Sequence, residues 1–390
     1  MAYRRYLTQT GLLIATGLLA LGLSLAFLWQ AGELDAADSV ANRQTDAGPD
    51  FLYGSALNQN TLAYKLALVN AVKPAVLIAG SSRTMQFRHW NFSGKTLTAG
   101  GAGSSIEEVS FFLDQALKGH TPQVIIIGVD FWWFHPDYRA EPPVLTQGDR
   151  VTKDKLLWVF REWRKQKIQG AEVMNILHSP AQDRAGLSAH LHQEGFRADG
   201  SWQYNLRWRT GKTGPNDLKH FRDTLQRIEK GNNQFLYGRH ADPQRMQQFT
   251  AMIRKLQARR IPVILFMAPL AKPVLDAMSR RPQDYLYLID VLSAAAVWGA
   301  PFLNLTDPAR VAAHDCEFID GFHGGDIVYA RIARQLAGIS GGALQTTAIN
   351  DRNALLKNRP SVDDLAVCPS DTPLPPSASL KPGDNHAPSS

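Results

Sequence analysis

The sequence predicts an α/β protein, with a doubly wound parallel sheet in three layers and one N-terminal transmembrane helix. Two observations predict it. A long uncharged apolar run opens the chain, and short β-rich apolar runs then alternate with helical patterns. Such alternation is typical of a parallel sheet with helices on both faces. Sheets of this kind bind ligands at the carboxyl ends of their strands, so candidate site residues are sought there.

The first element is the apolar run from Gly11 to Trp29, preceded by Arg4 and Arg5. It is long enough to cross a bilayer and longer than the core of a cleaved signal peptide, and it ends in bulky rather than small residues. The basic flank predicts a cytoplasmic N-terminus with the rest of the chain outside. Residues 1–32 are therefore expected to form an uncleaved, single-pass signal anchor of the inner (plasma) membrane. A cleaved signal is the alternative, and it leaves the body on the same periplasmic side.

The remaining chain divides by composition. Residues 33–50 are small and polar, which favours a linker. Residues 51–345 are expected to fold as one domain with a basic, Trp-rich helical insertion at about 138–240. The Pro- and Ser-rich end favours a largely disordered tail over 346–390.

Within the domain, apolar runs predict strands and amphipathic patterns predict helices. The last expected helix follows a glycine-containing loop. The expected strands cover 75–79, 96–99, 124–129, 262–267 and 301–305, and the expected helices cover 105–118, 243–259 and 326–336.

Two features of the aromatic residues each allow two interpretations. Leu156, Leu157, Phe160 and Trp163 have helical spacing among basic residues, which fits either a membrane-surface helix or a helix packed on its own domain. The second feature is a set of tryptophans that could stack on sugars or belong to the core. These are Trp132, Trp133, Trp202 and Trp208.

Charge and cysteine content bound the partners. The formal net charge of +7 is spread along the 390 residues, so nucleic acid binding is not expected. No cofactor and no metal are expected. Cys316 and Cys368 lie in a compartment where disulfides persist, and they are expected either to bridge or to remain free thiols.

Three residues have the types and positions of a Ser-His-Asp triad. Ser82 follows the first strand of the domain in a Gly-Ser turn, and Asp320 precedes His323 by three residues in the loop before the last helix. A serine nucleophile needs a histidine to accept its proton and a carboxylate to orient that histidine. We therefore expect Ser82, His323 and Asp320 to be catalytic.

At these positions the chain resembles the SGNH, or GDSL-like, hydrolase superfamily, whose fold is flavodoxin-like. The resemblance places Ser82 at the nucleophile, with Ser81 where the superfamily usually has aspartate. It implies that the amides of Ser82 and Gly103 form the oxyanion hole. Asp130 stands where the superfamily has an asparagine donor, and a carboxylate there would destabilise an oxyanion. Ser81, Arg83 and Asp130 are expected only to line the site.

The anchor, the Gly-Ser-Ser-Arg sequence and the aromatic run after Asp130 are similar to a narrower group. These are the membrane-anchored proteins of alginate O-acetylation and of D-alanyl transfer to teichoic acids. The resemblance implies a serine acyltransferase or esterase that acts in O-acylation (acetylation) of a cell-surface polysaccharide. It also implies a membrane-bound O-acyltransferase as partner.

Two other functions remain open. A non-catalytic polysaccharide-binding or assembly protein would account for the departures at Ser81 and Asp130. A metal hydrolase could use His314, Asp315 and Cys316 with the later Asp and His, although the spacing matches no zinc pattern. No Gly-x-Ser-x-Gly motif stands between a predicted strand and a predicted helix, where a nucleophile elbow would lie, and this argues against the α/β-hydrolase fold.

Overall fold

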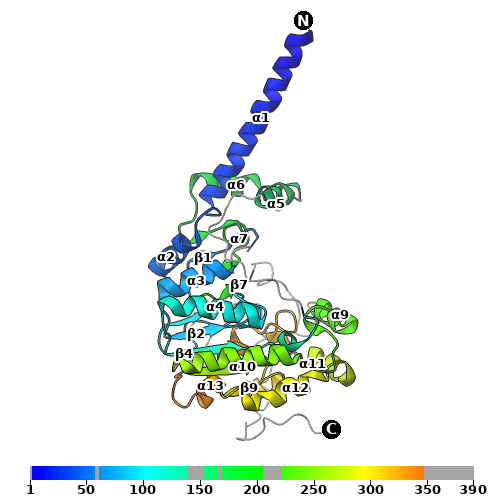
Figure 1. Ribbon diagram of the computed structural model, residues 1–390. Helices are drawn as coiled ribbons and strands as arrows, with labels where there is room; N and C mark the ends of the chain where they lie inside the picture. Colours follow the sequence, from blue (N-terminus) through cyan, green and yellow to red (C-terminus); the bar gives the residue numbers. More distant parts are fainter. Residues whose placement is uncertain (1, 58–60, 139–152, 166–167, 205–220, 347–390) are drawn as a thin grey trace. The chain divides into compact units, whose positions relative to one another are not determined.

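The computed structural model (Figure 1) describes most of the chain and divides it into two compact units. The N-terminal unit combines Met1–Asn60 with Thr146–Ala198, and the sheet unit combines Thr61–Leu145 with Asp199–Ser390. The described residues are 2–57, 61–138, 153–165, 168–204 and 221–346.

The sheet unit contains a five-stranded parallel sheet with the strand order β3-β2-β4-β8-β9. The central strands are buried throughout, which explains why they read as continuous apolar runs rather than as alternating ones. This confirms the predicted α/β class and parallel sheet. The strands are β2 (Val76–Ala79), β3 (Thr96–Thr98), β4 (Val124–Gly128), β8 (Val263–Met267) and β9 (Phe302–Asn304).

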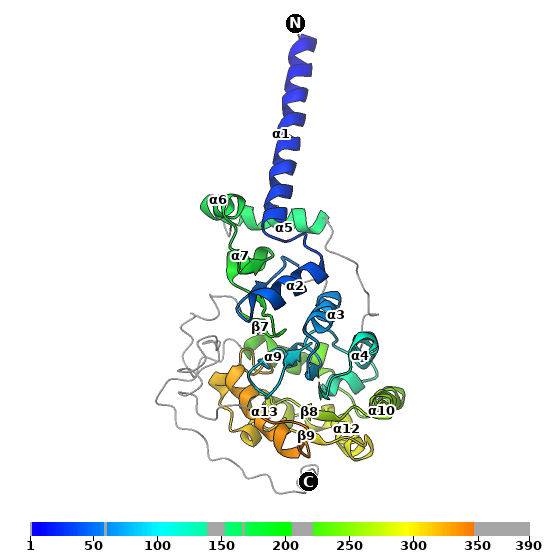
Figure 2. The ribbon, with the colours of Figure 1, turned by 90° about the vertical axis from the view of Figure 1, so that its left-hand side faces the viewer.

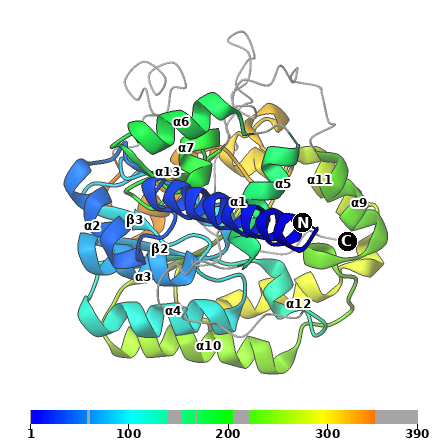
Figure 3. The ribbon, with the colours of Figure 1, turned by 90° about the horizontal axis from the view of Figure 1, so that it is seen from above.

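Helices of the sheet unit pack on these strands. Val328 and Ile332 of the last helix share a buried cluster with Ile78, Ile126 and Phe266 of the strands. Figure 3 shows α4 and α10 running side by side, and α10 also contacts β8. The helices are α3 (Thr61–Val72), α4 (Ile106–Gly119), α9 (Arg222–Lys230), α10 (Pro243–Ala258), α11 (Lys272–Ser279), α12 (Tyr287–Ala294) and α13 (Asp326–Ile339). Short elements complete the unit: β7 (Trp202–Gln203) and the 3-10 turns at Ser82–Thr84, Phe131–Phe134, Asn233–Phe235, Pro282–Asp284, Ala295–Val297, Pro308–Val311 and Asp315–Glu317.

Local signals set the starts of two of these helices. The Ser105 hydroxyl accepts a hydrogen bond from the Glu108 amide at 3.2 Å and caps α4. Asp242 accepts from the Gln244 amide at 2.8 Å and caps α10, with Pro243 in the first helical position. These caps explain why both helices begin within one residue of their predicted starts.

The N-terminal unit is mainly helical, with short strands in which β1 pairs parallel to β5 and antiparallel to β6. Its helices are α1 (Ala2–Gln30), α2 (Ala37–Ala47), α5 (Lys153–Arg164), α6 (Gly170–His178) and α7 (Leu187–His192). Its strands are β1 (Leu52–Tyr53), β5 (Arg184–Ala185) and β6 (Gly195–Phe196).

Among the described residues, α1 is the one helix long and apolar enough to cross a membrane. Its apolar side chains are exposed over most of its length, including Leu12, Leu18 and Leu23. Only its end is buried, where Phe27 and Leu28 join an apolar cluster. The exposed part of α1 thus has the composition of a lipid-facing surface.

Two expected boundaries differ from the structure. The segment 33–50 contains α2, whose Val40 and Ala41 are buried, so it is folded rather than a linker. The Gln44 side chain explains the tight packing, because its amide donates to the carbonyl groups of Phe51 and Phe196 at 3.2 and 3.0 Å. The insertion expected at about 138–240 is shorter in the structure: residues 146–198 interrupt the sheet unit in sequence, and they group with residues 1–60 as the N-terminal unit.

The carboxylate of Glu33 joins four segments of the N-terminal unit. It is fully buried, and it accepts hydrogen bonds from the Ala56 amide at 3.0 Å and the Leu187 amide at 2.9 Å. The Lys155 ammonium of α5 lies 3.2 Å from its Oε1 and also donates to the Glu33 carbonyl at 3.0 Å. Burial raises the pKa of Glu33, and the charge of Lys155 opposes that rise. The pair therefore ties α5 to the chain that follows α1.

We predict that Lys155→Met destabilises the N-terminal unit by about 3–5 kcal/mol, because it leaves the buried Glu33 charge unpaired. The matched control is Arg43→Met. Arg43 also pairs with a carboxylate, that of Asp35 at 2.6 Å, but is 41% exposed. Its loss should cost about 0–1 kcal/mol. Hydrogen exchange of α5 and α6 in the full chain measures the difference, and equal protection in both variants would contradict the prediction.

Candidate active site

The sheet positions Ser82 at the carboxyl end of β2. The chain leaves the strand through Gly80, whose φ of +145° is unfavourable for a residue with a side chain. A Cβ atom at Gly80 would also come within 2.8 Å of Thr84 Cγ2. Ser81 then caps a 3-10 turn, since its hydroxyl accepts from the Arg83 amide at 3.2 Å. This tight turn leaves the Ser82 side chain partly exposed above the sheet.

The loop before α13 presents Asp320 and His323 at its tip. Its two arms are joined by hydrogen bonds from the Ile319 amide to the His323 carbonyl and from the Gly325 amide to the Glu317 carbonyl, both 2.8 Å long. The reversal between the arms needs Gly321, which has a φ of +93°. The three-residue spacing of the Asp and His is therefore the span of one tight turn.

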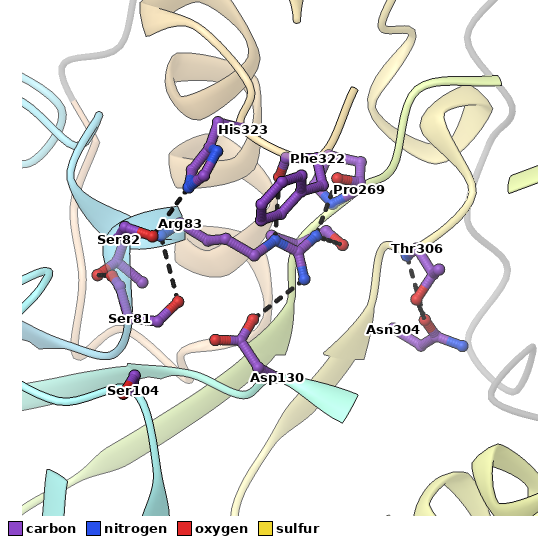
Figure 4. A network of polar contacts seen from close by, with 12 residues as sticks. Ser81, Ser82, Arg83, Ser104, Asp130, Pro269, Asn304, Thr306, Phe322 and His323 are labelled. Atoms are coloured by element: carbon purple, nitrogen blue, oxygen red, sulfur yellow. Dashed lines mark hydrogen bonds and ion pairs between the residues drawn. The ribbon is translucent and has the colours of Figure 1, made fainter. Parts of the chain in front are cut away.

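Figure 4 shows the His323 ring directed at Ser82. The distance from Ser82 Oγ to His323 Nε2 is 2.8 Å, and that from His323 Nδ1 to Asp320 Oδ2 is 2.7 Å. Ser82, distant in sequence from the Asp320–His323 pair, thus forms one continuous hydrogen-bonded chain with it. Both distances lie within the range for a nucleophile, its base and the group that orients the base.

Asp320 is held as an anion. Burial raises the pKa of its carboxyl group, but the charge of His323 and hydrogen bonds from the His323 ring and from the His323 and Phe322 amides outweigh burial. The net effect is a pKa below the ordinary value. An ionised Asp320 accepts a hydrogen bond from the Nδ1–H group of His323. In the neutral ring Nε2 then carries no proton, so it can accept the proton of Ser82.

The amides expected to form the oxyanion hole are available. Neither the Ser82 nor the Gly103 amide donates a hydrogen bond to any other described residue. Gly103 lies in the loop before α4, and this loop is tied to the nucleophile turn by a 3.1 Å bond from the Gly101 amide to the Gly80 carbonyl. The joint role of the two amides stays a prediction.

Asp130 does not stand as a free carboxylate beside the nucleophile. It is buried at the end of β4, and its Oδ1 lies 3.1 Å from Arg83 Nη1. Burial raises the pKa of Asp130, and the Arg83 guanidinium followed by the Ser81 hydroxyl opposes that rise. The charge that would repel an oxyanion is therefore directed at Arg83.

Arg83 does not simply line the site: it is buried, and its guanidinium group binds several chain segments. Its Nε donates to the Phe322 carbonyl at 3.0 Å, and its Nη2 donates to the carbonyls of Ala268 and Pro269 at 2.7 and 3.0 Å. Figure 4 shows the guanidinium between Phe322 and Asp130. It therefore joins the nucleophile turn to the ends of β4 and β8 and to the residue before His323.

Two further contacts, absent from the sequence-based predictions, hold α13 near the nucleophile turn. The Tyr329 hydroxyl donates to the Arg83 carbonyl, and the buried Arg88 lies 3.0 Å from Asp326, the first residue of α13. A sequence signal existed for the Arg83 pair, since Arg83 and Asp130 follow neighbouring parallel strands and carry opposite charges. No comparable signal pointed to Tyr329 or Arg88.

The tryptophans after β4 belong to the core. Trp132 and Trp133 are 2% and 0% exposed, so neither offers a face to a sugar. Trp132 packs edge-on against Phe322 and lies 5.7 Å from the Arg83 guanidinium. Trp202 is almost fully buried, and Trp208 lies outside the described residues.

The residues of the alternative metal site do not form a cluster. Within the described ranges, no group of three or more His, Cys, Asp or Glu side chains is arranged to hold a metal ion. Cys316 is disulfide-bonded and so cannot act as a thiolate ligand. The other cysteine of the sequence, Cys368, lies outside the described residues.

Comparison with known proteins assigns this chain to no family. No protein-family model matches the sequence, and no curated protein is significantly similar to it.

We predict that Arg83→Met destabilises the sheet unit by about 3–5 kcal/mol, because it leaves the buried Asp130 charge without its partner. Arg83→Lys keeps the charge but cannot span three carbonyl groups and a carboxylate, so it should fall between Met and wild type. Urea unfolding followed by tryptophan fluorescence measures both.

The double variant Arg83→Met/Asp130→Leu tests the cause. It removes the unpaired charge and should be more stable than Arg83→Met alone, while remaining below wild type because the carbonyls stay unpaired. A double variant that is less stable than the single one would contradict this assignment.

Proposed function

We propose that this protein is a serine-dependent acyl-transfer enzyme, an esterase or O-acyltransferase of the SGNH type. The observation that carries the proposal is the hydrogen-bonded chain from Ser82 through His323 to Asp320. Its serine is partly exposed at the carboxyl end of a parallel strand, where sheets of this class bind ligands. If the serine of this hydrogen-bonded series were buried, a structural role would be favoured instead.

The geometry supports the following steps. Ser82 Oγ attacks the carbonyl carbon of an ester or thioester while His323 Nε2 takes its proton, and Asp320 stabilises the resulting imidazolium. The tetrahedral intermediate expels the donor alcohol or thiol, which receives that proton from His323. A second hydroxyl, of water or of a sugar, then attacks the acyl-serine with His323 again acting as base. Hydrolysis and transfer differ only in that second nucleophile.

In this proposal the amides of Ser82 and Gly103 stabilise the oxyanion. Asp130 replaces a donor that is worth about 3 kcal/mol in comparable sites. Its pairing with Arg83 removes the repulsion but supplies no donor in its place. We therefore expect slower turnover than a site with asparagine at this position would give.

The proposal includes the three-layer, doubly wound arrangement of the SGNH superfamily. The parallel order β3-β2-β4-β8-β9 supports it, as does α13 packed on the sheet directly after the His323 loop. The nucleophile after the first strand of this sheet and the Asp-His pair before its last helix have the positions that the resemblance implies.

The cellular setting is also a proposal. The span α1 supports a single-pass anchor in the inner (plasma) membrane, and the disulfide at Cys316 fits an oxidising, extracytoplasmic compartment. The substrate class we propose is an acyl, foremost acetyl, group carried to a cell-surface polysaccharide. A membrane-bound O-acyltransferase would supply that group from the membrane.

The test assays acetyl-ester turnover by the purified full chain and the acetyl content of the surface polymer in cells. Ser82→Ala and His323→Ala should each reduce turnover by about 10⁴- to 10⁶-fold, and the double variant should be no worse than either, because the residues act as a unit. Asp320→Asn should lose about 10⁴-fold, since an amide favours the wrong imidazole tautomer.

The matched control is Ser81→Ala, which removes a neighbouring hydroxyl that only caps the turn and faces Asp130. It should stay within a few-fold of wild type. If folded Ser82→Ala and His323→Ala proteins keep wild-type levels in both assays, the enzyme proposal fails. The non-catalytic polysaccharide-binding or assembly function, which the departure at Asp130 favours, would then replace it.

A further inference from the structure

One face of α5 exposes large apolar side chains to solvent. Leu157, Phe160 and Trp163 follow one another along the helix and are 53%, 64% and 52% exposed. Three such residues on successive turns form a contiguous apolar patch, and patches of this kind mark contact surfaces more often than scattered single residues do. We call these three residues the apolar flank of α5.

The opposite face of α5 is fixed to the end of α1. Trp158 is buried in one cluster with Phe27 and Leu28, two buried residues near the C-terminal end of α1. The buried ion pair of Lys155 with Glu33 holds the same face. Figure 2 shows α5 running across the end of α1. Because its buried face is occupied, α5 cannot turn the apolar flank inward.

The place of α5 along α1 is that of a membrane boundary. The exposed apolar surface of α1 continues to Trp29, which is 65% exposed, and the chain enters the folded unit directly after it. If α1 spans a bilayer, the hydrocarbon region ends near Trp29, since tryptophan favours that boundary. The helix α5 is then at the level of the boundary between the lipid headgroups and the hydrocarbon region.

Basic residues border the apolar flank. Arg161 and Arg164 are exposed on the same helix, and Lys165 follows at its end with 50% of its side chain exposed. The two acidic residues of α5 are Asp154, which is exposed in the first turn, and Glu162, whose carboxylate is buried beside Lys165 and Arg161. From Leu157 to Lys165 the exposed side chains are therefore apolar or cationic, the composition of a helix that lies in an anionic membrane surface.

We propose that α5 lies in the interface of the bilayer that α1 crosses, with the apolar flank below the headgroups and the basic residues among anionic headgroups. The inference rests on the proposed membrane anchor and not on the proposed acyl chemistry. It gives the N-terminal unit a second membrane contact beside α1. A helix spanning alone can rotate and tilt, whereas a second contact across its end fixes the orientation of the unit that it carries.

The experiment places an environment-sensitive fluorophore at single introduced cysteines in the unreduced full chain, reconstituted in phosphatidylglycerol-containing vesicles without other proteins. Phe160→Cys reports on the apolar flank, and Leu19→Cys reports on the middle of α1. His240→Cys is the exposed reference, since its side chain is 85% exposed. The wild-type chain, carried through the same labelling, gives the background.

We expect the label at position 160 to be blue-shifted and several-fold less accessible to an aqueous quencher than the label at position 240. Lipid-borne quenchers should reach it, though less deeply than at position 19. Replacing Arg161 and Arg164 together with glutamine should restore part of the aqueous accessibility at position 160. Vesicles of phosphatidylcholine alone should do the same.

A label at position 160 that is as accessible to the aqueous quencher as the label at 240, while position 19 is protected, would overturn the inference and leave the anchor intact. Loss of protection at position 19 as well would overturn both. Protection at position 160 that occurs in native membranes but not in these vesicles would assign the apolar flank to a membrane protein partner and overturn the lipid assignment.

Discussion

The arrangement of the candidate active site depends on the buried guanidinium group of Arg83. Arg83 follows Ser82 directly, and its donors reach Asp130 after β4, the Ala268 carbonyl after β8 and the Phe322 carbonyl before His323. Three segments that share no local sequence are thereby fixed against one turn. A lysine could satisfy one of these acceptors but lacks the planar fork that reaches all of them. Because Arg83 is next to Ser82 and binds the residue before His323, it helps to set the 2.8 Å distance between Ser82 Oγ and His323 Nε2.

The same residue accounts for the departure at Asp130. An arginine buried at this position needs a nearby anion, because an unpaired buried charge is strongly destabilising. Asp130 supplies that anion, and in the proposed SGNH-type mechanism it takes the place of an amide donor. We infer an exchange in which some stabilisation of the oxyanion is given up for a rigid nucleophile turn. The remaining donors would be backbone amides, which that turn holds in place.

The N-terminal unit uses a buried ion pair in a similar way. Glu33 and Lys155 join chain segments that are distant in sequence, and their pairing leaves α5 with one face fixed to the end of α1. The exposed apolar flank of α5 is a consequence of that constraint. Without the fixed face, the helix could bury its apolar side chains by rotating. The two units therefore depend on the same physical device, a buried charge pair that orders distant segments.

The sequence by itself predicted the five strands of the parallel sheet, the helices α4, α10 and α13, and the three residues of the Ser-His-Asp chain, but it missed α3, α9, α11 and α12. Apolar runs, caps such as Ser105 and Asp242, and the position of a residue relative to a strand end are local properties, so they can be recognised without tertiary contacts.

Only the tertiary structure decided the rest. The partners of Arg83, the burial of Trp132, the folded helix in 33–50 and the grouping of 146–198 with the N-terminal unit all arise from contacts between distant segments. The small polar residues of α2 predicted a linker from sequence. The helix is stabilised by the burial of a few positions, and distant segments of the chain decide which positions are buried. Local patterns carry no information about which distant residue completes a charge pair, and packing alone selects it.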